Sequence, residues 1–174
     1  MFRTIDARKP TLLLDEMDRL GKERKELITV VLNAGFHRSG KVDRCEGDDH
    51  QVREFEVYCP KAMAGIGDYM TETVSDRSVR LRMQKKLKGQ KVEKFRRYDP
   101  VDLRRKCLRW AKDNAELLCD IRPQMPEVLS DRQEDIWEGL FTIASQAGAD
   151  WPERTWCAAS AQAASATAEV TDDM

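Results

Sequence analysis

Two adjacent carboxylates, Asp15 and Glu16, follow a short apolar run that begins at Thr11, and together they could act on a nucleotide. The run predicts a buried parallel strand, which would place both acids at the carboxyl end of a sheet, where α/β proteins bind ligands. There Asp15 could be a metal ligand that holds Mg²⁺ through water, while Glu16 polarises the water that attacks the nucleotide. Because any strand that runs into a helix cap can carry this string, a purely structural role is the alternative.

A single arginine, Arg77, could add positive charge to the same chemistry. It directly precedes Ser78–Met83, where apolar and basic residues alternate as they do in a strand with one solvated face. From the edge of a sheet, an arginine could reach the γ-phosphate of a neighbouring subunit and neutralise transition-state charge. The alternative is an ion pair between Arg77 and Asp76 or another nearby acid.

Basic side chains are concentrated in the middle of the chain, although the formal net charge is only −1. Residues 77–112 carry 15 basic and 3 acidic side chains, whereas residues 113–174 carry 3 basic and 13 acidic ones. This asymmetry indicates that the middle segment meets ATP phosphates, nucleic acid or the acidic end of the same chain. Phe95 and Tyr98 lie among the charges and could stack on bases, or could be core residues under a solvated surface. The nucleic-acid-binding candidates are Arg96, Arg97, Arg104 and Arg105.

The predicted elements that position these residues are strands and helices up to residue 84, followed by helices only. Strands are predicted at 11–16, 41–46, 52–58, 61–67 and 78–83, and the second and third form a hairpin around residues 47–49. Helices are predicted at 23–34, 100–119, 131–147 and 151–166, with a short turn or helix at 71–76. The fold class is therefore α/β, with a core over residues 1–84, an all-helical lid over 85–166 and a disordered tail over 167–174.

Composition excludes several classes of protein. Charged residues make up 35% of the chain and hydrophobic residues 41%, which is typical of a soluble globular protein. The longest apolar stretches, Leu12–Leu14 and Ile28–Leu32, fall far short of the roughly 20 residues that span a membrane. The amino terminus also lacks an apolar signal segment. We therefore expect a cytoplasmic protein without a membrane partner. The five cysteines include no closely spaced pair, so neither a disulfide framework nor a zinc motif is predicted.

Several short strings recur in the order in which a known family carries them. They are TLLLDEMD at 11–18, LNAGFHRSG at 32–40, GDDH at 47–50, YCPKAMAGIG at 58–67, VSDRSVRLRM at 74–83, WAKDN at 110–114, SDR at 130–132, DIWEGL at 135–140 and GADWPER at 148–154. Through these strings, which span roughly residues 4–158, the chain resembles an uncharacterised C-terminal domain family of phage, plasmid and other mobile-element proteins. Members often stand beside primase-like or helicase-like modules.

The resemblance implies an incomplete P-loop NTPase-like core of the AAA+-like kind, made of a parallel sheet plus a hairpin, followed by an all-helical lid. It implies that Asp15 and Glu16 are the Walker B pair and that Arg77 is an arginine finger. Arg132 would be a second, nucleotide-binding arginine, for which the alternative is an ion pair at the start of a helix. Ala64–Gly67 departs from the pattern, because such ATPases often place a polar sensor residue there.

The phosphate-binding motif G-x-x-x-x-G-K-[ST] does not occur in the sequence. Its backbone N–H groups and its lysine normally cradle the phosphates, on a strand–loop–helix unit that precedes Walker B. Ten residues precede the predicted strand, which is too few for such a unit. We therefore expect ATP and Mg²⁺ to bind only with a P-loop-bearing partner chain or in a full-length form. Without that partner, apolar area on the sheet would be uncovered, which favours association.

Two functions from different classes follow. The first is the C-terminal portion of a mobile-element P-loop ATPase, helicase- or primase-associated, inactive alone, a homo-oligomer when complete and able to meet DNA or RNA. The second is a non-enzymatic basic module for nucleic-acid binding or oligomerisation. The first predicts turnover that appears with a P-loop-bearing chain and disappears in Glu16→Gln. The second predicts salt-sensitive retention of DNA or RNA that is indifferent to Glu16.

Overall fold

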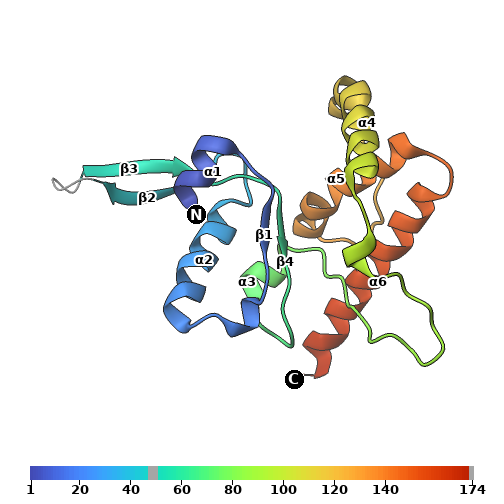
Figure 1. Ribbon diagram of the computed structural model, residues 1–174, viewed down its shortest axis with the longest axis horizontal. Helices are drawn as coiled ribbons and strands as arrows, with labels where there is room; N and C mark the ends of the chain where they lie inside the picture. Colours follow the sequence, from blue (N-terminus) through green and yellow to red (C-terminus); the bar gives the residue numbers. More distant parts are fainter. Residues whose placement is uncertain (47–50, 173–174) are drawn as a thin grey trace. The chain divides into compact units, whose positions relative to one another are not determined.

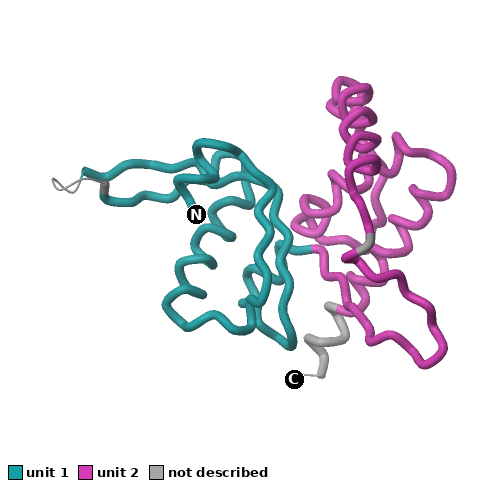
Figure 2. Tube along the Cα trace, viewed as in Figure 1, with its two compact units in different colours: residues 1–78 teal, residues 79–174 magenta. Residues whose placement is uncertain are grey.

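The computed structural model describes residues 1–46 and 51–172, and the side chains of Glu46, Arg97 and residues 166–172 lie outside that description. The chain forms two units, Met1–Ser78 and Val79–Met174, each with its own hydrophobic core (Figure 2). Strands occur in the first unit only among the described residues, so the fold is α/β with a helical C-terminal region. The units divide before residue 84, where the sequence predicts the end of the core.

Unit 1 combines three α-helices with four short strands (Figure 1). The elements are α1 (Phe2–Arg8), β1 (Leu12–Leu14), the 3-10 helix η1 (Met17–Arg19), α2 (Lys22–Ala34), β2 (Lys41–Glu46), β3 (Gln51–Glu56), β4 (Lys61–Met63) and α3 (Glu72–Ser75). Within the described residues, β1 pairs in parallel with β4, and β2 pairs antiparallel with β3. The predicted parallel strand, hairpin and amphipathic helix are thus confirmed. The predicted turn at residues 47–49 lies outside the described residues.

The core of unit 1 forms where α1, α2 and the hairpin meet. Ile5 and Val57 are completely buried, and Val31 on α2 packs with them. Val42 on β2 stands opposite Phe55 on β3, so the pleat sends both side chains to the same buried face. The ring of Phe2 lies edge-on to that of Phe55, with 4.9 Å between the ring centroids. This core holds the amino end of β1 against the rest of the unit.

Two strand predictions need correction. Strand β1 is not an interior strand, since Leu13 is 74% exposed. Its sheet has two strands in the described chain, and side chains alternate between faces, so the face that carries Leu13 is left open. Ser78–Met83 does not form a strand, because no described strand pairs with it and Met83 is 91% exposed. The Arg80 backbone N–H instead donates to Oε1 of Gln162, at 3.0 Å.

In the described residues of unit 2, three α-helices occur, as predicted, but a long loop precedes them where the sequence predicts the start of an all-helical lid. After the 3-10 helix η2 (Phe95–Arg97) come α4 (Val101–Asp120), α5 (Asp131–Ala147) and α6 (Trp151–Asp172). Ser130 is the N-cap of α5, and its N–H donates to Oε1 of Gln133 at 2.9 Å. The segment predicted as a tail, residues 167–174, overlaps the end of α6, and residues 173–174 lie outside the described residues.

The core of unit 2 lies between α5 and α6. Trp137 and Phe141 on α5 are buried against Ala159 and Ala163, whose small side chains let the two helices approach closely. Helix α4 differs, because none of its residues is buried, although its apolar residues predict an inward face. Its tie to α5 is a hydrogen bond from Nε2 of Gln146 to Oδ1 of Asn114, at 2.6 Å.

Among the residues that the structure describes, no helix has the length and apolar character needed to cross a lipid bilayer.

Candidate functional site

The acidic pair lies at the carboxyl end of the β1–β4 pair, the position that the sequence predicts. The Ala64 N–H donates to the Leu14 carbonyl at 2.8 Å, and the Met17 N–H donates to the Ala64 carbonyl at 3.0 Å. A third bond runs from the Ile66 N–H to Oδ1 of Asp18, at 3.0 Å. The turn that carries Asp15 and Glu16 is therefore anchored on both sides to the end of the neighbouring strand.

Glu16 has a strained backbone. Its φ of 52° and ψ of 38° lie in the left-handed region, which costs a residue with a side chain roughly 1–2 kcal/mol. Two contacts hold this conformation: the Glu16 N–H donates to Oδ1 of Asp15 at 2.8 Å, and Nη1 of Arg19 donates to Oε1 of Glu16 at 2.8 Å. Such strain is concentrated at functional sites, where it fixes the direction of a side chain. Both carboxylates are exposed and so accessible to a ligand.

Arg77 occupies a different part of unit 1. It follows α3 rather than preceding a strand, and its Nη1 donates to the Thr73 carbonyl at 2.8 Å. Its guanidinium lies over the ring of Phe36, 5.7 Å from the centroid. Phe36 follows the last turn of α2, whereas Glu16 precedes the first turn. Among the described residues no hydrogen bond or ion pair joins Arg77 to either acid of the pair.

The other predicted arginines belong to unit 2. Arg132 is exposed in the first turn of α5. Arg96 lies in η2, and Arg104 and Arg105 lie in the first turns of α4, all three exposed. Of Arg97 only the backbone is described. The structure therefore brings the nucleic-acid-binding candidates together on one stretch of chain, separate from the unit that carries the acidic pair.

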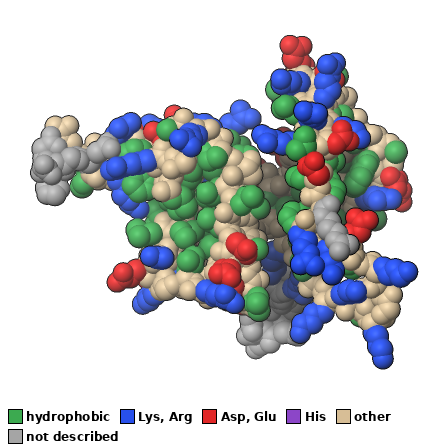
Figure 3. All heavy atoms as spheres, in the orientation of Figure 1, with side chains coloured by type: hydrophobic (Ala, Val, Ile, Leu, Met, Phe, Trp, Pro, Cys, Tyr) green, Lys and Arg blue, Asp and Glu red, His purple; other side chains and the backbone are tan. Residues whose placement is uncertain are grey.

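Arg96 and Arg97 belong to a longer segment before α4, the basic loop, which we define as residues 79–98. It turns at Gly89, whose φ of 92° favours glycine, and the Gln90 N–H donates to the Leu87 carbonyl at 3.1 Å. Figure 3 shows Lys and Arg side chains gathered over this loop, which Figure 1 draws in light green before α4. Six exposed cations, Lys85, Lys86, Lys88, Lys91, Lys94 and Arg96, form its surface. No acid in the described part of the chain pairs with any of these six.

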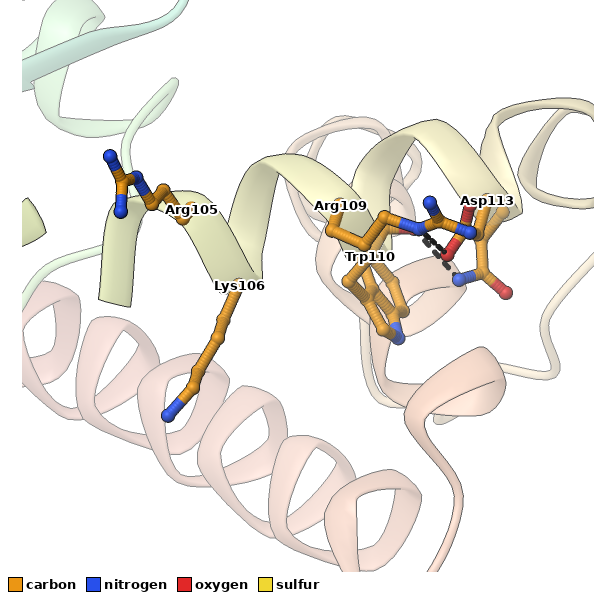
Figure 4. A pocket seen from close by; sticks show the side chains of 6 residues that line it. Arg105, Lys106, Arg109, Trp110 and Asp113 are labelled. Atoms are coloured by element: carbon orange, nitrogen blue, oxygen red, sulfur yellow. Dashed lines mark hydrogen bonds and ion pairs between the residues drawn. The ribbon is translucent and has the colours of Figure 1, made fainter. Parts of the chain in front are cut away.

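A shallow hollow lies along α4, next to the basic loop in sequence. Its volume is about 450 Å³, and Figure 4 shows the side chains that line it, which include Arg105 and Trp110. Arg109 donates to Asp113 at 2.6 Å, and this hydrogen bond raises the pKa of the arginine above its ordinary value. Lys106 pairs with Asp102 at 2.8 Å. Because both of those cations are matched by acids one turn away, the hollow is less attractive to an anion than the loop.

Sequence reasoning missed one residue that organises unit 1. The ammonium of Lys61 donates to three carbonyls: to Gly35 at 2.9 Å, to Cys59 at 2.9 Å and to Val57 at 3.2 Å. Burial lowers the pKa of Lys61. The Gly35 carbonyl lies at the C-terminus of α2, where a cation is favourable. The only signal in the sequence is a lysine at the start of an otherwise small and apolar strand.

The acidic pair offers carboxylate oxygens, which are ligands for hard cations such as Mg²⁺. Among the side chains that the structure describes, no group of three or more His, Cys, Asp or Glu residues could hold a metal. Mg²⁺ does not need such a group, since it is commonly bound by one or two carboxylates together with waters and substrate phosphates. The exposed carboxylates of Asp15 and Glu16 fit this pattern.

Comparison with known proteins adds one match. A family model described as "Protein of unknown function (DUF3631)" matches residues 82–173, which include most of the basic loop and helices α4 to α6. No curated protein and no solved structure matches the chain. The matched residues cover more than half of the chain and lie within unit 2.

Proposed function

The chain belongs to that family of proteins of unknown function, and from this premise we propose that it is the C-terminal portion of a P-loop ATPase linked to nucleic-acid processing by mobile elements. The observation that carries the proposal is the acidic pair, placed at the carboxyl end of a parallel strand pair and pinned to the neighbouring strand. Both carboxylates are exposed, and Glu16 holds its own on a left-handed backbone, a form of strain that is concentrated at functional sites.

Each residue of the pair has a separate task in this proposal. Asp15, the nearer to the strand, would hold Mg²⁺ through water, and a bound Mg²⁺ would supply positive charge against the nucleotide phosphates. Glu16 orients the attacking water and polarises it. Arg19 now neutralises Glu16, so this exposed ion pair must open before Glu16 can act, at a cost of about 0–1 kcal/mol.

The arginines complete the proposal from other parts of an assembly. Arg77 forms no hydrogen bond or ion pair with the acidic pair in the described chain, and in this proposal it acts on the nucleotide of a neighbouring copy, as in a ring or filament. Arg132, at the start of α5, would contact the nucleotide from the lid. The P-loop itself would come from a partner chain or from a longer form of this protein, because the 174 residues contain no such motif.

The test is reconstitution of ATP hydrolysis. The chain is mixed with a candidate partner polypeptide that carries G-x-x-x-x-G-K-[ST], and phosphate release is measured. We expect turnover by the mixture only, and a loss of roughly 100-fold or more in Glu16→Gln, in line with the loss of a catalytic base. Glu23→Gln is the matched control, since Glu23 is an exposed acid of the same unit in the first turn of α2. Equal activity of Glu16→Gln and Glu23→Gln would refute the proposal.

A further inference from the structure

Six cations of the basic loop have no acidic partner in the described chain: Lys85, Lys86, Lys88, Lys91, Lys94 and Arg96. Residues 79–98 contain nine basic side chains and one acidic one. Three acids of the following region, Asp102, Asp113 and Asp150, pair instead with cations four residues away. Like charges held this close repel one another, so the loop gains free energy when a polyanion neutralises it.

Two aromatic rings are exposed within this charged surface. Phe95 is 84% exposed and Tyr98 is 46% exposed, so neither belongs to the core. Their ring centroids lie 6.4 Å apart with an interplanar angle of 32°. An exposed phenylalanine has no hydrogen bond to offer solvent, and its face is an apolar platform of the size of a base.

This combination distinguishes among polyanions. An acidic protein would use the cations but would leave the faces of both rings unused. A DNA duplex offers phosphates, but its bases are already stacked on one another. A single strand presents phosphates and free base faces together, at a spacing that a flexible loop can follow.

We propose that the basic loop binds single-stranded nucleic acid: Lys85, Lys86, Lys88, Lys91, Lys94 and Arg96 contact phosphates, and Phe95 and Tyr98 stack on bases. This binding is independent of the ATPase proposal, because it requires neither the acidic pair nor a nucleotide. The proposal gives a binding surface and a class of ligand to the region that the family model matches, residues 82–173.

The experiment measures binding of the intact chain to fluorescently labelled dT20 and rU20 by anisotropy, without nucleotide, over a range of salt concentrations. If all six cations contact phosphates, affinity falls about 300-fold between 50 and 200 mM salt, from a logarithmic slope of about −4. Replacing Lys85, Lys86 and Lys88 with Gln reduces this slope to about −2. The matched control replaces three exposed cations of unit 1, Lys22, Arg24 and Arg38, with Gln and leaves the slope unchanged.

The stacking part of the proposal has its own variant. Phe95→Ala weakens binding roughly 5- to 150-fold with no change in slope, whereas Phe95→Trp retains the affinity because it keeps a stacking face. Preference for dT20 or for rU20 tells which nucleic acid is bound, and either supports the proposal. Absence of binding at 50 mM salt overturns it. So does equal affinity for a 20-base-pair duplex with no effect of Phe95→Ala, and so does tighter binding to polyglutamate, which would point to an acidic protein partner.

Discussion

The Lys61 ammonium offers the sharpest test of what holds unit 1 together. It joins two segments that are separated in sequence: the end of α2, through the Gly35 carbonyl, and the stretch from β3 into β4, through the Val57 and Cys59 carbonyls. The substitution Lys61→Met keeps a similar length and flexibility but removes all three hydrogen-bond donors. It therefore separates the contribution of the ammonium from that of the side-chain stem.

The size of the effect follows from the three carbonyls. The residues that carry them, Gly35, Val57 and Cys59, are buried, so water can replace the ammonium only in part. A buried carbonyl without a partner costs about 1–3 kcal/mol, which sets an upper limit near 9 kcal/mol for three. Lys61→Met also removes the free-energy cost of burying a charge, and this gain offsets much of the loss from the three carbonyls. Burial is the main cause of the lowered pKa of Lys61. We expect a net loss of about 3 kcal/mol, or about 12–24 °C in the melting temperature of a unit of this size.

The two units can be followed separately, because all four tryptophans lie in unit 2. Urea unfolding of the full chain is monitored by tryptophan fluorescence for unit 2 and by far-UV circular dichroism for both units. Lys41→Met is the control, since Lys41 also pairs with an acid, Glu54 at 2.5 Å, but on an exposed hairpin where the pair is worth at most about 1 kcal/mol. The reasoning is refuted if Lys61→Met and Lys41→Met shift the dichroism transition equally.

Three further predictions concern pH, the second core and the strained acid. Because the pKa of Lys61 is lowered in the folded chain, the unfolded chain binds more protons as pH approaches the ordinary value of 10.5. Stability of the natural chain should therefore rise relative to Lys61→Met between pH 8 and 10 in urea titrations, and a fall would contradict this assignment. Phe141→Ala, at a buried site, should destabilise unit 2 by about 3–5 kcal/mol by tryptophan fluorescence, with exposed Leu140→Ala costing far less. Glu16→Gly should leave unit 1 as stable in urea unfolding or up to about 1 kcal/mol more stable, because glycine tolerates the left-handed backbone. The reconstituted ATPase should lose turnover in the same variant. Clear destabilisation would show that Glu16 has a structural role instead.

Local patterns in the sequence predict most of the elements. The hairpin and helices α2, α4, α5 and α6 follow from periodicity and from stop signals such as Gly35 and the prolines after α4, all of which act within a few residues. The acidic pair is placed correctly for the same reason, because a strand that runs into a turn needs no distant partner to be recognised.

The errors arise where structure depends on distant segments. Alternation at Ser78–Met83 suggests a strand, but a strand forms only where another backbone satisfies its hydrogen bonds, and none is present in the described chain. The burial of β1 was predicted from its three leucines, although burial also depends on how many strands lie beside it. The Lys61 contacts could not be predicted, since they require the Gly35 carbonyl at the end of α2 to meet the nearby Val57 and Cys59 carbonyls at one ammonium.

The open face of the β1–β4 pair has a thermodynamic consequence. A pair of three-residue parallel strands is too small to be stable without neighbours, and such sheets are normally covered on both sides. Any molecule that binds the exposed Leu13 face in the folded state alone shifts the folding equilibrium by mass action, by about 2.7 kcal/mol at a concentration 100 times its dissociation constant. The melting temperature of unit 1 would therefore depend on the concentration of such a ligand, and would rise as that concentration rises.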